Sequence, residues 1–182
     1  MHAYSTHNRQ LERRGDLVVW TADDTKSADK YLALFNLNDP KTWIWASDTI
    51  NRNRKKQYFD VSVSGATDLY LVVDALGNYS ADHADWIKPM LYTASGDSIC
   101  LTELDWESAT TGWGSVRKNS QCEGKNLVVD GITYSEGIGT HAQSVIHYRI
   151  TGYDRLKGMV GLDYEGERQA STRPAVQFRL YT

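Results

Sequence analysis

The residues best suited to binding chemistry lie close together in the second half of the chain. Two tryptophans, Trp106 and Trp113, are accompanied by one carboxylate, Asp105, and two cations, Arg117 and Lys118. An indole ring offers a broad apolar face, while carboxylate, guanidinium and ammonium groups exchange hydrogen bonds with hydroxyls. Such a set suits a ligand that carries hydroxyl groups around an apolar face. Packing in the core is the stronger interpretation for Trp106, whereas glycines on both sides of Trp113 are equally compatible with an exposed ring.

A second candidate segment is residues 136–142, with the sequence E-G-I-G-T-H-A. We predict a loop whose two glycines allow close backbone approach, in which Glu136 supplies an acceptor and His141 a donor or an acceptor. The competing interpretation is a tight bend between strands, with His141 bonded to a buried carbonyl. A phosphate-binding loop is set aside, because G-x-G without a third glycine and a following helix is not specific.

The sequence establishes no cofactor, but its acidic residues invite a Ca²⁺ site, since hard cations bind several carboxylate oxygens. The expected ligands are Asp74, Asp82 and Asp85, although their spacing is not that of an EF-hand. In the competing interpretation, Asp82 and Asp85 cap turns. A hydrolytic pair, either Asp82 with Asp85 or Glu103 with Asp105, would have to face one cleft about 5 to 10 Å apart. No pocket-forming framework is visible around either pair.

Composition limits the classes of protein to which this chain can belong. The 182 residues suffice for one ordinary domain, and a net charge of −3 with scattered lysine and arginine argues against a nucleic-acid partner. No apolar run approaches the ~20 residues that span a bilayer, and the first residues lack the apolar region of a signal peptide, so we expect no membrane partner. Cys100 and Cys122 form either one disulfide or two buried thiols. Six tryptophans and eleven tyrosines against three phenylalanines suit β-sheet cores and sugar-stacking surfaces alike.

The elements that must position these residues are predicted to be strands. Helical periodicity is almost absent, and short β-branched and aromatic runs alternate with turn residues, which is typical of an all-β sandwich or barrel. Alternation within residues 145–150 places His147 at the surface or an edge. Asp130 and Gly131 predict a two-residue hairpin turn of the primed type. The strands are expected at residues 17–21, 31–37, 42–46, 58–63, 69–74, 126–129, 144–150, 156–163 and 175–181.

Four motifs together resemble the NPCBM family of carbohydrate-binding modules, which overlaps carbohydrate-binding module family 51. They are L-x-x-L-x-W at 101–106, G-W-G at 112–114, Y-x-x-G-I-G-x-H-A-x-S at 134–144 and V-G-L-D at 160–163. The resemblance implies a β-sandwich of the jelly-roll, galactose-binding-domain-like type. It also implies non-catalytic binding of glycans that contain galactose or N-acetylgalactosamine, and an extracellular or periplasmic location. The expected sugar-binding residues are Asp105, Trp113, Arg117, Lys118, Glu136 and His141.

The order of the halves is unusual for this family. Residues 59–74 and 82–86 resemble its C-terminal half, yet they precede the motifs above. The simplest explanation is a circular permutation, which requires residues 175–181 to lie beside residues 43–47. Leu76 and Asn78 stand where the family tends to show glycine and aspartate, which leaves a calcium site one carboxylate short.

The first 38 residues look like a separate piece. Two apolar runs within them resemble the end of the β-domain that follows the barrel in glycoside hydrolase family 27, the α-galactosidases and α-N-acetylgalactosaminidases. We therefore expect residues 1–38 to be a hairpin remnant and residues 39–182 a permuted binding module, from the C-terminal end of an α-galactosidase-like hydrolase whose catalytic barrel is absent here. Two alternatives remain: a structural spacer of that hydrolase that binds no sugar, and a glycosidase fragment with its own activity.

Overall fold

A computed structural model of the chain describes residues 43–76, 80–169, 171 and 173–182, together with the backbone of three strands near the N-terminus. These strands are β1 (Arg9–Arg14), β2 (Leu17–Ala22) and β3 (Leu34–Asn36), which form an antiparallel sheet in the order β1-β2-β3. The chain divides into two units, Met1–Trp43 and Ile44–Thr182. The predicted boundary at residues 38 and 39 lies outside the described residues.

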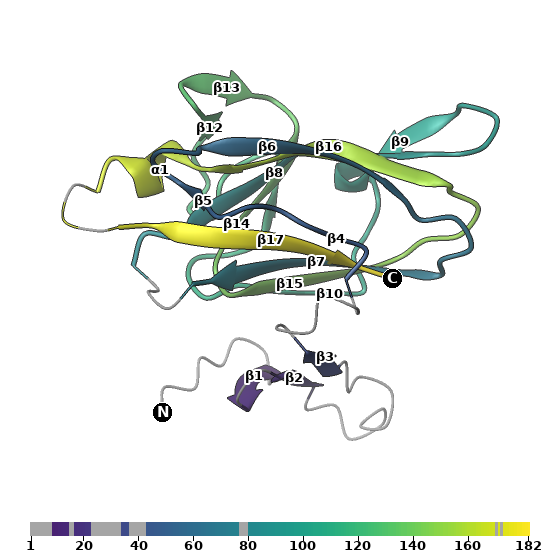
Figure 1. Ribbon diagram of the computed structural model, residues 1–182, viewed down its shortest axis with the longest axis horizontal. Helices are drawn as coiled ribbons and strands as arrows, with labels where there is room; N and C mark the ends of the chain where they lie inside the picture. Colours follow the sequence, from purple (N-terminus) through teal and green to yellow (C-terminus); the bar gives the residue numbers. More distant parts are fainter. Residues whose placement is uncertain are drawn as a thin grey trace. The chain divides into compact units, whose positions relative to one another are not determined.

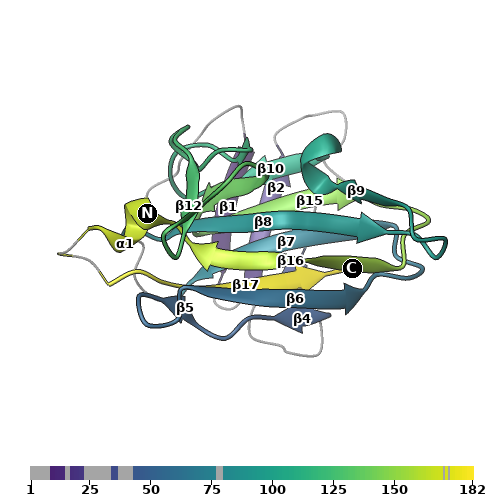
Figure 2. The ribbon, with the colours of Figure 1, turned by 90° about the horizontal axis from the view of Figure 1, so that it is seen from above.

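The larger unit is an antiparallel β-sandwich, which confirms the predicted fold class (Figures 1 and 2). We call its two layers the β7 sheet, in the order β10-β15-β7-β17-β4 with β5 beside β17, and the β8 sheet, in the order β11-β14-β8-β16-β6 with β9 beside β8. The helical parts of the described residues are a 3-10 turn at Leu101–Glu103 and the four-residue α1 (Tyr164–Glu167). The strands are β4 (Trp45–Ala46), β5 (Ile50–Asn51), β6 (Lys56–Ser62), β7 (Asp68–Ala75), β8 (His83–Tyr92), β9 (Ser98–Cys100), β10 (Ser108–Thr110), β11 (Arg117–Lys118), β12 (Leu127–Val129), β13 (Ile132–Tyr134), β14 (Gly137–His141), β15 (Ser144–Arg149), β16 (Arg155–Leu162) and β17 (Ala175–Tyr181).

The core lies between the two sheets, where alternate side chains of each strand meet. Trp86 of β8 is fully buried, with its ring centroid 5.9 Å from that of Phe59 and 5.0 Å from that of Phe178 in the opposite sheet. Both contacts are edge-on, an arrangement that aromatic pairs favour. Cys100 and Cys122 are buried free thiols, so the disulfide alternative is wrong.

Four strands of the β8 sheet lie outside the ranges predicted from the sequence: β8, β9, β11 and β14. β8 lies between β14 and β16, but a lysine and a proline near its middle obscure its pattern. The predicted loop at 136–142 is also wrong, because Gly137–His141 forms β14, whose five residues are all buried. The glycines there permit strand packing rather than a bend.

His147 is a further correction. Its neighbours Ile146 and Tyr148 belong to the core cluster, so His147 faces away from the core as alternation requires. It is nevertheless only 7 % exposed, because its ring stacks on that of Tyr70 at 4.3 Å and its Nε2 lies 2.8 Å from Asp68 Oδ1. The predicted surface position is wrong.

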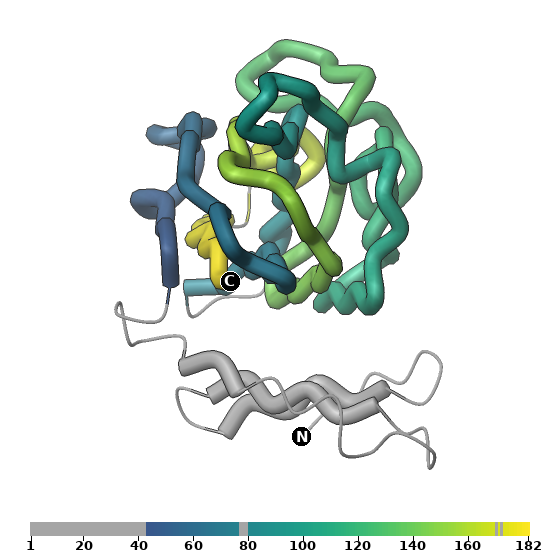
Figure 3. Tube along the Cα trace, turned by 90° about the vertical axis from the view of Figure 1, so that its right-hand side faces the viewer, coloured from purple at the N-terminus to yellow at the C-terminus, as the bar shows by residue number. Residues whose placement is uncertain are grey.

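The predicted hairpin at Asp130 and Gly131 is confirmed. Both residues have positive φ, 50° and 75°, and join β12 to β13 in an antiparallel pair. Positive φ at both positions is the geometry of the primed turn. The hairpin projects beyond the β8 sheet, on the side away from the β7 sheet (Figures 1 and 3).

The two ends of the larger unit meet in one sheet. β17 pairs with β4, so that Arg179 faces Ala46 and Leu180 faces Trp45. The Ile44 amide also donates to the Leu180 carbonyl at 2.8 Å. The predicted proximity of residues 175–181 to residues 43–47 is confirmed.

Candidate functional site

Three of the six predicted sugar-binding residues line a single pocket of about 510 Å³. They are Asp105, Arg117 and Lys118, and the pocket is completed by Trp106 and Ser120. A pocket of this volume falls within the range of about 300 to 1,000 Å³ that small-molecule sites occupy. The pocket therefore unites an aromatic ring with both signs of charge and a hydroxyl.

The pocket is positioned by the pairing of β11 with β14, in which Lys118 faces Ile138 and Arg117 faces Gly139. A Cβ on Gly139 would lie closer than 3.0 Å to the Ser120 carbonyl and to Gln121 Cα. The absence of a side chain at Gly139 thus lets residues 120 and 121 pack directly on β14.

Asn119 reinforces this packing. Its backbone adopts a positive φ of 57°, its amide donates to the Gly137 carbonyl at 2.7 Å, and its side-chain oxygen accepts from the Gly137 amide at 3.3 Å. Asparagine tolerates this backbone conformation better than most residues. The segment that follows β11 is therefore fixed against β14, and Ser120 is held beside Lys118.

Lys118 connects β11 to residues 104–106. Its ammonium donates to the Leu104 carbonyl at 2.7 Å, lies 3.4 Å from Asp105 Oδ1 and stands 5.0 Å from the centre of the Trp106 ring. The Asp105 side chain is fully exposed, so solvent weakens its ion pair with Lys118. Both charged groups remain accessible to a ligand.

Trp106 serves the core and the pocket at once. Its ring is half-buried and meets the buried ring of Tyr148 at a centroid distance of 6.5 Å, in an edge-on arrangement. It packs against the core cluster while also lining the pocket. The two interpretations offered for this residue are therefore compatible.

Trp113 stands outside the pocket lining and is 57 % exposed. A Cβ on Gly112 would overlap the Ala142 carbonyl, and one on Gly114 would lie 2.6 Å from the Cys122 carbonyl. Because both neighbouring glycines press against backbone, the tryptophan between them is directed outward.

The structure does not bring Glu136 and His141 into the pocket lining. Glu136 is half-buried and immediately precedes β14. His141 is 5 % exposed, and its Nδ1 is bonded to the Ala142 carbonyl at 2.7 Å. Burial lowers the pKa of His141 to about 4, so its ring is neutral at physiological pH. This contact matches the structural alternative considered for His141.

The three expected calcium ligands do not converge. Asp74 accepts from Gln143 Nε2 at 2.5 Å and pairs with Arg179, while Asp82 accepts from a backbone amide. Asp85 is fully buried in β8. Among the residues that the structure describes, no three His, Cys, Asp or Glu side chains are placed to hold a metal ion. The donor set does not fit calcium, and the metal site stays a prediction without structural support.

The surroundings of the two suggested hydrolytic pairs do not match those of a catalytic carboxylate pair. Burial raises the pKa of Asp82 to about 7 and that of Asp85 well above its usual value. Asp85 is 0 % exposed, which keeps it from any substrate. Glu103 accepts from the Cys100 amide at 3.2 Å, and among the described residues that line the pocket, Asp105 is the one carboxylate.

Ser120 was missed because an isolated serine in a polar segment carries no signal of its own. Its i, i+2 relation to Lys118 gives no signal either, because Asn119 between them has a positive φ of 57° and the segment is not extended there.

No helix among the described residues is long and apolar enough to cross a membrane.

Comparison with known proteins gives one relative, named "Putative endo-alpha-N-acetylgalactosaminidase", from Renibacterium salmoninarum. It is 25% identical over 112 residues, which cover 57% of this chain and 7% of the relative. The chain thus spans a small part of that protein's length. No solved structure matches. The family model for the NPCBM/NEW2 domain matches residues 1–92 and 97–182. The chain therefore belongs to the NPCBM/NEW2 domain family, a family of carbohydrate-binding modules.

Proposed function

We propose that this chain is a non-catalytic module that binds galactose-type glycans and is carried by an α-galactosidase-like glycoside hydrolase outside the cytoplasm. The observation that supports it most is the pocket in which Trp106 lies beside Asp105, Arg117, Lys118 and Ser120. The relative's name refers to N-acetylgalactosamine, which favours that sugar within the galactose series.

The chemistry of the pocket suits adjacent hydroxyls of one sugar. Asp105 and Lys118 are 3.4 Å apart, so that one hydroxyl can donate to the carboxylate while its neighbour accepts from the ammonium. Arg117 adds a forked donor, and Trp106 supplies apolar contact. An epimer with a misplaced hydroxyl leaves one of these groups unpaired, at a cost of about 1–3 kcal/mol.

The number of carboxylates in the pocket supports a binding role rather than a hydrolytic one. The part of its lining that the structure describes contains one carboxylate, Asp105, whereas glycoside hydrolysis ordinarily uses two across one cleft. Affinity for a single sugar is expected to be weak, about −4 to −8 kcal/mol, and to act by keeping the attached enzyme near its substrate.

A circular permutation is part of the proposal. The pairing of β17 with β4 places the two ends of the larger unit side by side. The family match is interrupted at residues 93–96, in the turn between β8 and β9. There the Thr93 amide donates to the Asp97 carbonyl at 2.9 Å. We infer that the usual ends of the family's domain are joined at this turn, while this chain opens at β4 and β17.

Titration of the purified chain with galactose, N-acetylgalactosamine and glucose, followed by calorimetry or NMR, tests the binding proposal. We expect the two galactose-type sugars to bind and glucose, the epimer at one hydroxyl, to bind at least fivefold more weakly. Lys118→Met should weaken binding about tenfold, or about 1.4 kcal/mol, while Lys56→Met should not, because Lys56 is a lysine of similar exposure that lines neither pocket and pairs with Asp130. Failure of every galactose-type sugar to bind would contradict the proposal.

A further inference from the structure

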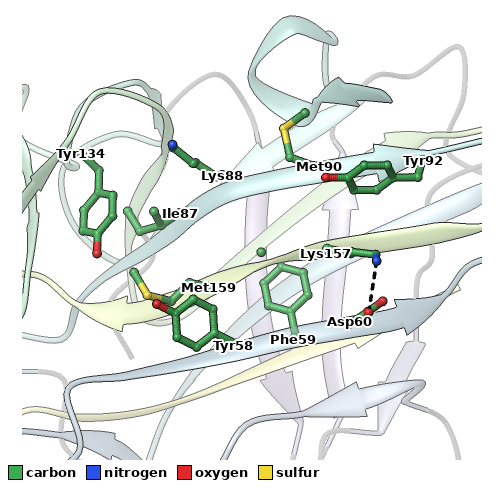
Figure 4. Close-up of a pocket in the computed structure, with 11 residues that line it drawn as sticks. Tyr58, Phe59, Asp60, Ile87, Lys88, Met90, Tyr92, Tyr134, Lys157 and Met159 are labelled. Carbon is green, nitrogen blue, oxygen red and sulfur yellow. Dashed lines mark ion pairs between the residues drawn. The ribbon is translucent and has the colours of Figure 1, made fainter. Parts of the chain in front are cut away.

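A second groove crosses the outer face of the β8 sheet and shares no residue with the pocket above (Figure 4). Its volume is about 430 Å³, and it is lined from β6, β8, β16 and the β12–β13 hairpin. The floor is apolar: Ile87 and Met159 are 2 % and 3 % exposed, and the half-buried Met90 continues it. The hairpin contributes Tyr134 at one end.

A bulge in β8 shapes this floor. The pairing of β8 with β16 shifts between Lys157 and Met159, so Met90 faces Lys157 while Ile87 faces Met159. Lys88, inside the bulge, has a positive φ of 46°. In a regular strand, residues three apart point to opposite faces, but here Ile87 and Met90 both line the groove. The irregularity therefore widens the apolar floor.

Tyrosine rings stand at both ends of the groove (Figure 4). Tyr58 and Tyr134 lie at one end and Tyr92 at the other. Tyr58 on β6 faces Met159 and Tyr92 on β8 faces Arg155. The two tyrosines are therefore offset by about 13 Å along β16, four residues at ~3.3 Å each, and by two strand spacings of ~4.8 Å across it, which together give about 16 Å. Tyr58 is 71 % exposed. This spacing exceeds a single pyranose ring and suits a chain of three or four.

Polar groups lie between the rings. Lys157 Nζ is 3.3 Å from Asp60 Oδ2 and 5.4 Å from the centre of the Tyr92 ring. Asp60 also accepts from Arg155 at 2.8 Å, so its charge is compensated. Lys88 is exposed, and its ammonium forms no ion pair with any described residue. Both ammonium groups can donate to hydroxyls of a neutral ligand.

We propose that this groove is a second binding site, which holds a linear segment of a neutral glycan with the pyranose rings at its two ends on Tyr58 and Tyr92. An apolar floor with aromatic ends and hydroxyl-binding groups between them matches alternating apolar faces and hydroxyls of such a chain. A folded protein partner fits less well, because a stable protein interface needs about 800 Å² from each side, far more than this groove offers. The proposal does not depend on sugar binding at Lys118.

Methionine methyl NMR offers a direct test. Two of the chain's three methionines, Met90 and Met159, line the groove. With ¹³C-methyl methionine and a linear galactotetraose or xylotetraose, we expect both groove methyls to shift on titration. The corresponding monosaccharides should shift them far less.

Gel retardation by soluble galactan, xylan and β-glucan gives the second measurement. We expect at least one polymer to retard the protein, and Tyr58→Ala to reduce retardation at least fivefold without unfolding, since its side chain is mostly in solvent. Tyr164→Ala changes another exposed tyrosine, 48 % exposed and outside the groove, and as the control should have no effect. The proposal is overturned if no polymer or tetrasaccharide binds, or if binding survives Tyr58→Ala. It is also overturned if binding is lost only with Lys118→Met, and that result leaves the galactose proposal standing.

Discussion

Replacing Gly139 by alanine should damage both the fold and the pocket. The added Cβ would lie closer than 3.0 Å to three backbone atoms: the Ser120 carbonyl oxygen, Gln121 Cα and Gln121 carbonyl carbon. Backbone cannot rotate away as a flexible side chain can, so β14 and residues 120–121 must move apart. Overpacking of this kind typically costs about 1–3 kcal/mol, and we expect about 3 kcal/mol because every overlapping atom belongs to the backbone.

The assay is chemical and thermal unfolding of the purified chain. At about 2–4 °C for each kcal/mol in a chain of this size, the melting temperature should fall by roughly 6–12 °C. Galactose affinity should fall with it, because Ser120 shifts relative to Lys118. Gly131→Asn is the matched control, since a Cβ on Gly131 would meet no atom of the described residues within 4 Å and its φ of 75° is one that asparagine tolerates. The reasoning is refuted if Gly139→Ala changes the unfolding free energy by less than about 0.5 kcal/mol, a change within the usual range of surface substitutions.

Three further predictions concern buried groups. Burial, assisted by the Asp163 carboxylate, raises the pKa of Asp85, so the unfolded chain ionises first and stability falls by up to ~1.4 kcal/mol per unit as pH rises above about 4. Asp85→Asn should flatten that slope in urea unfolding between pH 4.5 and 8; an unchanged slope would contradict the assignment. Burial raises the pKa of Cys122 to about 12, so Ellman's reagent should label it only after unfolding, and labelling of the native chain would show that the site opens. Adding or chelating calcium should leave the melting temperature within about 1 °C, because Asp74 and Asp82 have other partners; a larger rise with calcium would reinstate the metal site.

The all-β class and several individual strands could be predicted from sequence because their signals are local. Alternation and turn residues sit next to one another in the chain. The predicted range 175–181 coincides with β17, and Asp130 with Gly131 forms the expected turn. Family membership was also visible, since the motifs at 101–106 and 134–144 are continuous in sequence.

The strand at His83–Tyr92 shows where local signals end. Lysine and proline at 88 and 89 argue against a central strand, and the bulge that accommodates them exists only because β16 shifts its register there. The sequence of Gly137–His141 suggested a loop because its two glycines, judged from local sequence alone, argue against a strand. Its glycines are explained by backbone that approaches from Trp86 and from residues 120–121, distant in sequence.

The two candidate sites show the same contrast between what local sequence predicts and what long-range strand pairing decides. Asp105, Arg117 and Lys118 lie within 13 positions of one another in sequence, so residue types and spacing were enough to group them. Residue types alone had included His141 with them, but its burial and its bond to a backbone carbonyl were decided by the packing of β14. The groove on the β8 sheet joins Tyr58 to Met159, about a hundred residues apart, because the antiparallel pairing of β6 with β16 places them opposite each other. Sequence determines which side chains are available, whereas long-range strand pairing determines which of them share a surface, because register depends on contacts that no local segment encodes.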